Sequence, residues 1–536
     1  MTDTSGKNRM LLSGNEAVAL AARDAGVALA SAYPGTPSTE ILESLAALGG
    51  PAQWAPNEKV AYEVALGAAF GGARALACMK HVGVNVAADP VFTSTYTGVS
   101  GGLVLVSADD PGMASSQNEQ DNRRYAVAAG MPMIEPSDSQ EAYEFLFAAF
   151  EISERWKLPV MLRMTTRVCH SQTVVTPRAN RLEPLAAHFE HDIRGRVMIP
   201  GFARPAHRRL RAKLEEIYAW GETMPLHRRF DGSKKLGIIT AGVCYVHARE
   251  AAPAGSFLKL GMTYPLPYTM IKEFAKSVER CVVIEENDPY LVDACRAIGV
   301  ACEGKAEMYR FDEMNVDRVR RILAHDESPE PIRPPGKPPQ LCVGCPHRSA
   351  LSVLKKLDCI IMGDIGCYTL GVLPPIDAMD SCVCMGASIG NGLGLRHVLP
   401  PDEARRVVSV IGDSTFVHGG ITGLVEMAYN PPPTGHVVLI LDNGTTAMTG
   451  LQDHPGTGVR LNKKDTHKLS FEDLARSIGI KNVHVFTGVD PAGFEALVKE
   501  SLASEELTLI IARRPCLLSV KKQKARTASV TEKANA

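Results

Sequence analysis

The chain has 536 residues, of which 45% are hydrophobic and 22% charged, and its formal net charge is −1. This composition is typical of a globular protein with about three domains, and the near-zero charge argues against a general nucleic-acid or membrane-surface binder. No apolar run is long enough to span a bilayer, and the N-terminus lacks the apolar stretch of a signal peptide, so we expect a cytoplasmic protein.

Residues 1–185 alternate helical and strand patterns, as expected for a mostly parallel α/β sheet. A helix is predicted over Ala17–Ala25, and strands are predicted over Val27–Ala32, Leu103–Val106 and Pro159–Met164. Residues 186–234 are polar and basic. We interpret that segment as a linker with one helix, and its charge run as a solvated face.

Residues 235–328 form a second α/β block, with strands at Leu236–Thr240 and Cys281–Glu285, and a proline-rich stretch marks its end. Residues 329–520 form a third block, followed by a polar tail at 521–536 that we expect to be disordered. The third block contains three buried-strand patterns, over Val407–Ile411, His436–Asp442 and Thr508–Ala512.

Polar residues follow two of these strands. Gly412, Asp413 and Ser414 come directly after the first, and Asn443 comes thirty residues after Asp413, at the end of the next. Ligands of open α/β sheets bind at this edge, and Mg²⁺ prefers oxygen ligands. The pattern predicts a Mg²⁺–diphosphate site in which Asp413, Asn443 and a backbone carbonyl near Thr445 hold the metal. The diphosphate is expected to contact Gly386, Ser388, Gly412, Ser414 and Met448, and glycines 386, 390, 392 and 394 allow a close backbone approach.

This arrangement resembles the thiamine-diphosphate motif, usually Gly-Asp-Gly followed by Asn-Asn, with Ser414 and Gly444 as departures. Thiamine enzymes also place a glutamate on their pyrimidine domain, where it bonds the aminopyrimidine ring in a dry site. Asn57-Glu58-Lys59-Val60-Ala61, ahead of a helix of small residues, resembles the start of such a domain and predicts Glu58 as this residue. Glu63 is the fallback, and a helix-terminal Glu58 favoured only by the dipole is the structural alternative.

The thirteen cysteines are more than packing needs, and a reducing compartment argues against a disulfide framework. Cys342 and Cys345 form a C-x-x-C, Cys367 follows a glycine and Cys516 a proline. Four thiolates suit zinc or an iron–sulfur cluster, although the C-x-C of Cys382 and Cys384 makes a poor zinc ribbon, and unligated cysteines are the remaining alternative.

Long stretches resemble the alpha-subunit family of indolepyruvate ferredoxin oxidoreductases, within the 2-oxoacid:ferredoxin oxidoreductases. They are residues 33–40, 80–85, 342–348, 412–416 and 443–450. The resemblance implies two thiamine-diphosphate-binding α/β domains, pyrimidine (1–185) and diphosphate (329–520), with a transketolase-C-terminal-like domain between them. It also implies a 4Fe-4S cluster on Cys342, Cys345, Cys367 and Cys516.

In such an enzyme Glu58 would help deprotonate the thiazolium carbon and Thr36 would contact the substrate. The Lys80–Asn85 loop would lie near the reacting centre, with His347 and His418 as pocket residues. An aryl pyruvate would lose CO₂, coenzyme A would take the acyl group, and the cluster would take the electrons. The implied partners are a beta subunit, in a dimer of heterodimers, and ferredoxin or another acceptor. The family's usual C-terminal ferredoxin-like domain is replaced by the polar tail from Lys521, so electrons are expected to leave through the single cluster.

Two other functions remain open from the sequence. A non-oxidative thiamine-dependent 2-oxoacid decarboxylase or carboligase would need no cluster, and anaerobic purification with an iron assay would distinguish it. A non-catalytic paralogue is the second, although the presence of Glu58, Asp413 and Asn443 argues against it.

Overall fold

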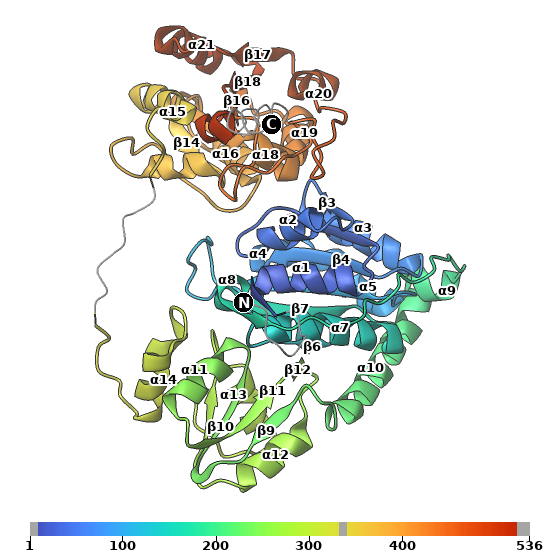
Figure 1. Ribbon diagram of the computed structural model, residues 1–536. Coiled ribbons are helices and arrows are strands. Elements are labelled where there is room, and N and C mark those ends of the chain that lie inside the picture. The colour runs from blue at the N-terminus through green and yellow to red at the C-terminus, as the bar shows by residue number, and fades with distance from the viewer. Residues whose placement is uncertain (1–8, 332–339, 523–536) are drawn as a thin grey trace, which may run out of the picture. The chain divides into compact units, whose positions relative to one another are not determined.

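The computed structural model describes residues 9–331 and 340–522, and the chain divides into two compact units, unit 1 (Met1–Pro331) and unit 2 (Ile332–Ala536). The proline-rich boundary from residue 332 to 339, and the predicted disordered tail from 523, fall outside the described residues. The predicted α/β fold class is confirmed, and the finer division into domains stays a prediction (Figure 1).

The first sheet of unit 1 has the strand order β12-β6-β7-β5-β4-β2-β3 within the described residues, and only the β12–β6 pair is antiparallel. Its central strands are buried on both faces, which explains their mostly apolar sequences. The strands are β2 (Leu29–Ala32), β3 (Ala52–Trp54), β4 (Ala75–Lys80), β5 (Leu103–Asp109), β6 (Met133–Ile134), β7 (Val160–Thr165) and β12 (Met262–Tyr264).

Helices surround this sheet, and several begin after a residue whose side chain caps the first turn. Ser13 and Glu16 form a capping box at α1, and Asn57 accepts a hydrogen bond from the Val60 amide at the start of α3. The helices are α1 (Gly14–Asp24), α2 (Thr39–Ala47), α3 (Glu58–Phe70), α4 (His81–Val86), α5 (Ala88–Thr97), α6 (Arg123–Ala129), α7 (Ser139–Trp156) and α8 (Thr166–His170). Strands β1 (Met10–Ser13) and β8 (Gln172–Val175) pair separately.

The segment predicted as a linker is more structured than expected. It contains α9 (Ile193–Arg196), α10 (Pro200–Gly221) and strand β9 (Arg228–Phe230). Helix α10 buries Ala206, Leu210, Leu214, Ile217 and Gly221, which recur at helical spacing along one face. It runs along unit 1 from α9 to α12 (Figure 1), where Tyr218 contacts Tyr268 with ring centroids 5.6 Å apart.

A four-stranded sheet in the order β13-β10-β11-β9 forms the rest of unit 1. Strand β12 leaves this region to complete the edge of the larger sheet, so the two sheets share one continuous chain segment. The remaining elements are β10 (Ser233–Ala241), α11 (Val243–Ala251), β11 (Gly255–Leu260), α12 (Tyr268–Lys276), β13 (Cys281–Ile284), α13 (Leu291–Ala297), the 3₁₀ helix η1 (Glu307–Arg310) and α14 (Val316–Leu323).

Unit 2 is built on a parallel sheet in the order β14-β15-β16-β18-β17, with an apolar core on each face. The strands are β14 (Ile360–Met362), β15 (Val407–Gly412), β16 (His436–Asp442), β17 (Asn482–Phe486) and β18 (Leu507–Arg513). The other elements are α15 (Pro346–Lys356), η2 (Cys367–Val372), α16 (Ala387–Val398), α17 (Pro401–Ala404), α18 (Asp413–Thr415), η3 (Phe416–Gly420), α19 (Ile421–Tyr429), α20 (Phe471–Ile478) and α21 (Pro491–Ala503).

Candidate active site

The predicted metal ligands of unit 2 lie together at one edge of its sheet. Strands β15 and β16 are parallel neighbours with Gly412 opposite Leu441, so Asp413 and Asn443 follow adjacent strand ends. Both side chains are buried. Because the strands end at the same edge, residues thirty apart in sequence reach one site without a long loop.

Asp413 is held by three donors. Its Oδ1 accepts a hydrogen bond from the Ser414 amide (2.9 Å), and its Oδ2 accepts one from the Gly444 amide (2.8 Å). The ring Nε2 of His454 lies 3.2 Å from the same Oδ2. Burial alone would raise the pKa of Asp413, but the bond and charge of His454, with these backbone amides, lower it below its usual value. Asp413 therefore stays a carboxylate inside the protein.

His454 was not predicted from the sequence. It lies 41 residues from Asp413 along the chain, and an isolated histidine in a loop carries no periodic signal. The adjacent motif His454-Pro455-Gly456 offered the only hint.

Asn443 is oriented by two neighbours. Its Oδ1 accepts a hydrogen bond from the Thr445 amide (3.0 Å), and its Nδ2 lies 3.2 Å from Nε2 of His347, in the first turn of α15. Burial lowers the pKa of His347 to about 4, so the ring is neutral near pH 7 and Nε2 can accept from the amide. The oxygen of Asn443 is thereby turned away from the histidine, as metal coordination requires.

The amino end of α16 differs from the expected phosphate cradle. The carboxylate of Asp364 accepts hydrogen bonds from the backbone amides of Gly386 (2.9 Å) and Ser388 (3.0 Å). The Ser388 hydroxyl is buried beside it, without a well-oriented hydrogen bond to any described residue. Gly392 serves packing, since an added Cβ there would lie 2.3 Å from the Ser409 hydroxyl. Gly386 is required locally, because its φ is +93° and it packs against the backbone of Gly419.

Of the other predicted cofactor contacts, Gly412 and Ser414 flank Asp413 in the chain. Gly412 ends β15, and the Ser414 hydroxyl lies 2.7 Å from the Thr446 hydroxyl. Thr445 is buried and its hydroxyl donates to the Gln452 carbonyl (3.1 Å), whereas Met448 is 50% exposed. His418 is buried in η3, next to Gly419.

The four predicted cluster cysteines also lie near one another. Burial, together with the neighbouring Cys345, Cys516 and Cys342, raises the pKa of Cys367 to about 11. The backbone amide of Cys516 donates to the carbonyl of Asn443 (3.0 Å), so this cysteine is one hydrogen bond from a predicted metal ligand. No three His, Cys, Asp or Glu side chains converge closely enough to hold a metal ion in the part of the chain that the structure describes.

Glu58 is the first residue of α3 and is buried in unit 1. Its side chain packs over Gly83 of α4, where an added Cβ would lie 2.7 Å from Cγ of Glu58. Lys80, at the end of β4, is near enough for the Glu58 carboxylate to raise its pKa, although burial lowers that pKa overall. Glu63, the fallback, lies on the exposed side of α3 and pairs with Lys59.

Thr36 lies in the loop before α2, and this loop packs against Lys80. An added Cβ at Gly35 would lie 3.3 Å from Cδ of Lys80. Asn15 of α1 donates to the Pro37 carbonyl (2.7 Å), which ties the loop to the helix behind it. The structure thus brings the Thr36 loop, Lys80 and Glu58 to one side of the larger sheet of unit 1.

A Mg²⁺–diphosphate group fits the unit 2 site by its donors. The oxygens of Asp413 and Asn443 each accept at least one backbone amide and have lone pairs left for a cation. Ser388 supplies a buried hydroxyl that has no well-oriented partner among the described residues.

Comparison with known proteins supports thiamine-diphosphate binding. Residues 20–207 match the family "Pyruvate flavodoxin/ferredoxin oxidoreductase, thiamine diP-bdg". Residues 364–512 match "Thiamine pyrophosphate enzyme, C-terminal TPP binding domain". The chain is 39% identical to the indolepyruvate oxidoreductase subunit IorA of Archaeoglobus fulgidus, over 96% of this chain and 88% of that protein. It is 37% identical to IorA of Thermococcus kodakarensis, over 95% of this chain and 86% of that protein.

The chain belongs to the IorA family. As a member of that family it is a subunit of a thiamine-diphosphate-dependent 2-oxoacid oxidoreductase, and the predictions of family and enzyme class are confirmed.

The IorA-like fold also resembles a solved structure. A 2-oxoglutarate:ferredoxin oxidoreductase from Magnetococcus marinus superposes with a TM-score of 0.52 and 17% identity, over 61% of this chain and 66% of that chain. Of the helices within residues 9–331 and 340–522, none has both the length and the apolar character needed to cross a membrane.

Proposed function

We propose that this IorA-family chain is the alpha subunit of a heteromeric enzyme that oxidatively decarboxylates aryl pyruvates. The reaction converts an aryl pyruvate and coenzyme A to aryl-acetyl-CoA and CO₂, and it releases two electrons and one proton. The electrons pass singly through one 4Fe-4S cluster to ferredoxin or another acceptor. The relatives are named as subunits of indolepyruvate oxidoreductases, and this supports the aryl substrate and a beta subunit.

One observation carries the oxidative part of the proposal. The side-chain oxygen of Asn443, which accepts the Thr445 amide, is a proposed metal ligand, and the backbone carbonyl of Asn443 accepts a hydrogen bond from the Cys516 amide. His347, which orients Asn443, lies two residues after Cys345. The cysteines and the diphosphate edge therefore share the same short segments. A redox centre on those cysteines would lie close to the cofactor, as electron transfer from a bound intermediate requires.

The cluster ligands are Cys342, Cys345, Cys367 and Cys516. Cys345, Cys516 and Cys342 lie near enough to Cys367 for each to raise the pKa of its thiol. Four neighbouring thiolates suit a four-iron cluster, and the sequence offers no second C-x-x-C for a zinc ribbon.

Each half of the cofactor site has a distinct task. Thiamine diphosphate supplies a carbanion-stabilising ring for decarboxylation when it is bound. In unit 2, Asp413, Asn443 and the Thr445 backbone would hold Mg²⁺, and Gly386, Ser388, Gly412, Ser414 and Met448 would contact the cofactor, with His347 and His418 as pocket residues. In unit 1, Glu58 would exchange a proton with the aminopyrimidine ring. Thr36 would contact the substrate, and the Lys80–Asn85 loop would lie near the reacting centre.

The substrate is tested with the chain co-expressed with its beta subunit and purified anaerobically. Viologen reduction is followed with indolepyruvate, phenylpyruvate, hydroxyphenylpyruvate, pyruvate and 2-oxoglutarate, with and without coenzyme A. The proposal predicts the highest kcat/KM for an aryl pyruvate and a requirement for coenzyme A in turnover. A preference for 2-oxoglutarate or pyruvate would overturn the substrate assignment.

The cluster is tested by iron content and visible absorption. Cys345→Ser and Cys367→Ser should each lose most of the roughly four irons per chain and all viologen reduction. Cys359→Ser is the matched control, because Cys359 is a partly buried cysteine of the same unit outside the set. Iron-free protein that still decarboxylates would support the non-oxidative alternative instead.

A further inference from the structure

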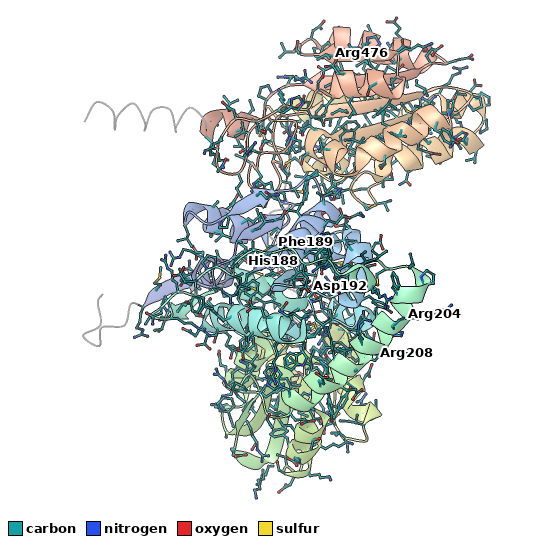
Figure 2. The ribbon with its side chains drawn as sticks, turned by 90° about the vertical axis from the view of Figure 1, so that its right-hand side faces the viewer. His188, Phe189, Asp192, Arg204, Arg208 and Arg476 are labelled. Carbon is teal, nitrogen blue, oxygen red and sulfur yellow. The ribbon has the colours of Figure 1, made fainter. Side chains whose placement is uncertain are left out.

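A cavity of about 400 Å³ opens on unit 1, and its lining includes none of the residues assigned to catalysis. It lies between the end of α5, the turn after α7, the short helix α9 and one face of α10. Figure 2 labels Asp192, at the start of α9, and the exposed Arg204 and Arg208 of α10. The volume of the cavity falls within the usual range for small-ligand sites.

The lining is strongly cationic. Five basic side chains from three segments contribute to it: Lys157, Arg194, Arg196, Arg209 and Lys213. Asp192 is the one carboxylate of the described lining, and it is engaged in accepting the Gly195 amide (2.8 Å) at the start of α9.

These cations are not neutralised by the protein. None of the five forms an ion pair with a carboxylate belonging to the described residues. Lys157 donates only to the Ser100 carbonyl (2.8 Å). Burial lowers the pKa of Lys213, and the neighbouring charges of Arg209 and Lys157 lower it further. The cavity therefore concentrates repelling charges, and this repulsion raises the free energy of the protein when no anion is bound.

Part of the cavity wall is held in place. Arg196 donates to the Glu190 carbonyl (2.6 Å) and the Ser100 hydroxyl (2.5 Å). Its guanidinium lies between the rings of Phe70 and Phe189, at 5.1 and 4.9 Å from their centroids. Stacking of this kind holds an arginine in place without a counter-ion that would neutralise its charge. The charge of Arg196 thus remains available to a ligand.

We propose that this cavity binds a small ligand with two or more adjacent phosphate groups, such as a nucleoside diphosphate. One carboxylate or one phosphate would neutralise only part of the lining, whereas adjacent phosphates supply several charges and many acceptor oxygens for the arginine forks. Tyr96, which lines the cavity and stacks on His207 with centroids 5.5 Å apart, offers an aromatic wall for a base. A recessed cavity suits a small anion better than a nucleic-acid strand. The lining of the cavity shares no residue with the proposed thiamine-diphosphate site, and the inference does not depend on the proposed reaction.

The test is isothermal titration of the full chain, saturated with thiamine diphosphate and Mg²⁺, with ADP, AMP, CoA and pyrophosphate at low salt. We expect saturable binding of ADP that weakens as salt rises, and weaker binding of AMP. Arg209→Ala/Lys213→Ala should lower the ADP affinity at least about tenfold, because each removes a charged hydrogen-bond donor. Lys157→Ala, from another segment, should act in the same direction.

Arg204→Ala/Arg208→Ala is the matched control, since it removes two exposed arginines from the same helix outside the cavity. It should change the affinity less than about threefold, and Asp413→Asn should leave ADP binding intact. Thermal melting of each variant verifies folding. If pyrophosphate bound as tightly as ADP, the result would support the phosphate site and would show that the nucleoside base adds no affinity. The proposal would be overturned if neither ADP nor pyrophosphate bound, or if the Arg209→Ala/Lys213→Ala and Arg204→Ala/Arg208→Ala variants lost the same amount of ADP affinity. It would also be overturned if single-stranded RNA bound more tightly than ADP and displaced it.

Discussion

Glu286, directly after β13, is a buried carboxyl whose charge the fold disfavours. Its side chain is 6% exposed, and its Oε1 has no hydrogen-bond partner among the described residues. Burial raises its pKa from 4.5 to about 7, despite the opposing charge of Arg163. Glu286→Gln would replace the carboxyl by a neutral group of the same shape.

The size of the effect follows from the pKa. Between pH 4.5 and 7 the folded protein keeps a proton at Glu286 that the unfolded chain has lost, so stability falls as pH rises through this window. The shift corresponds to about 3 kcal/mol at pH 8, at about 1.4 kcal/mol per pKa unit. We expect Glu286→Gln to match the parent near pH 4.5 and to be more stable by up to about 3 kcal/mol at pH 8.

Urea unfolding followed by tryptophan fluorescence measures this directly. All three tryptophans, Trp54, Trp156 and Trp220, belong to unit 1, which also holds Glu286. Glu250→Gln, at an exposed glutamate on α11, is the control and should change nothing. A variant less stable than the parent at pH 8, or a difference that stays constant between pH 5 and 8, would refute the reasoning.

Three further predictions concern the active site. Gly83→Ala should lower kcat at least about tenfold with little change in thiamine-diphosphate affinity. The added Cβ would lie 2.7 Å from Cγ of Glu58 and would displace the glutamate side chain. Unchanged kcat in steady-state assays would contradict that packing. His347→Ala should weaken Mg²⁺-dependent cofactor binding about tenfold by releasing the Asn443 amide, and His347→Gln should restore part of it, as calorimetry would measure. Dialysis against EDTA should release thiamine diphosphate from the parent, and retention after chelation would argue against metal-mediated binding.

Much of the fold could be predicted because its signals are local. The buried strands β15 and β16 are unbroken runs rich in Val, Ile and Leu, and both were predicted to within one residue. Strand β12 carried no such signal. It is three residues long, and it joins the larger sheet through antiparallel pairing with β6, more than a hundred residues away. Pairing at that separation depends on tertiary contacts that local sequence does not encode.

The residues of the candidate site also divide into those with a local sequence signal and those without one. Asp413 and Asn443 could be found because each follows a recognisable strand, and Glu58 because its segment resembles the start of a thiamine pyrimidine domain. Two site residues were missed. Asp364 accepts hydrogen bonds from backbone amides at the start of α16, and the ring of His454 lies within hydrogen-bond distance of Asp413. Both act from loops, where hydrogen bonding rather than periodicity decides position.

The Mg²⁺-dependent binding of thiamine diphosphate to the full chain, measured by calorimetry, tests the central claim most directly. The parent should bind the cofactor saturably and only with Mg²⁺, and Asp413→Asn should weaken binding by about a hundredfold, because it removes the buried charge at the metal site. Glu58→Gln should bind the cofactor nearly as well as the parent and fail to turn over. Equal cofactor affinity in the parent and Asp413→Asn would contradict the account.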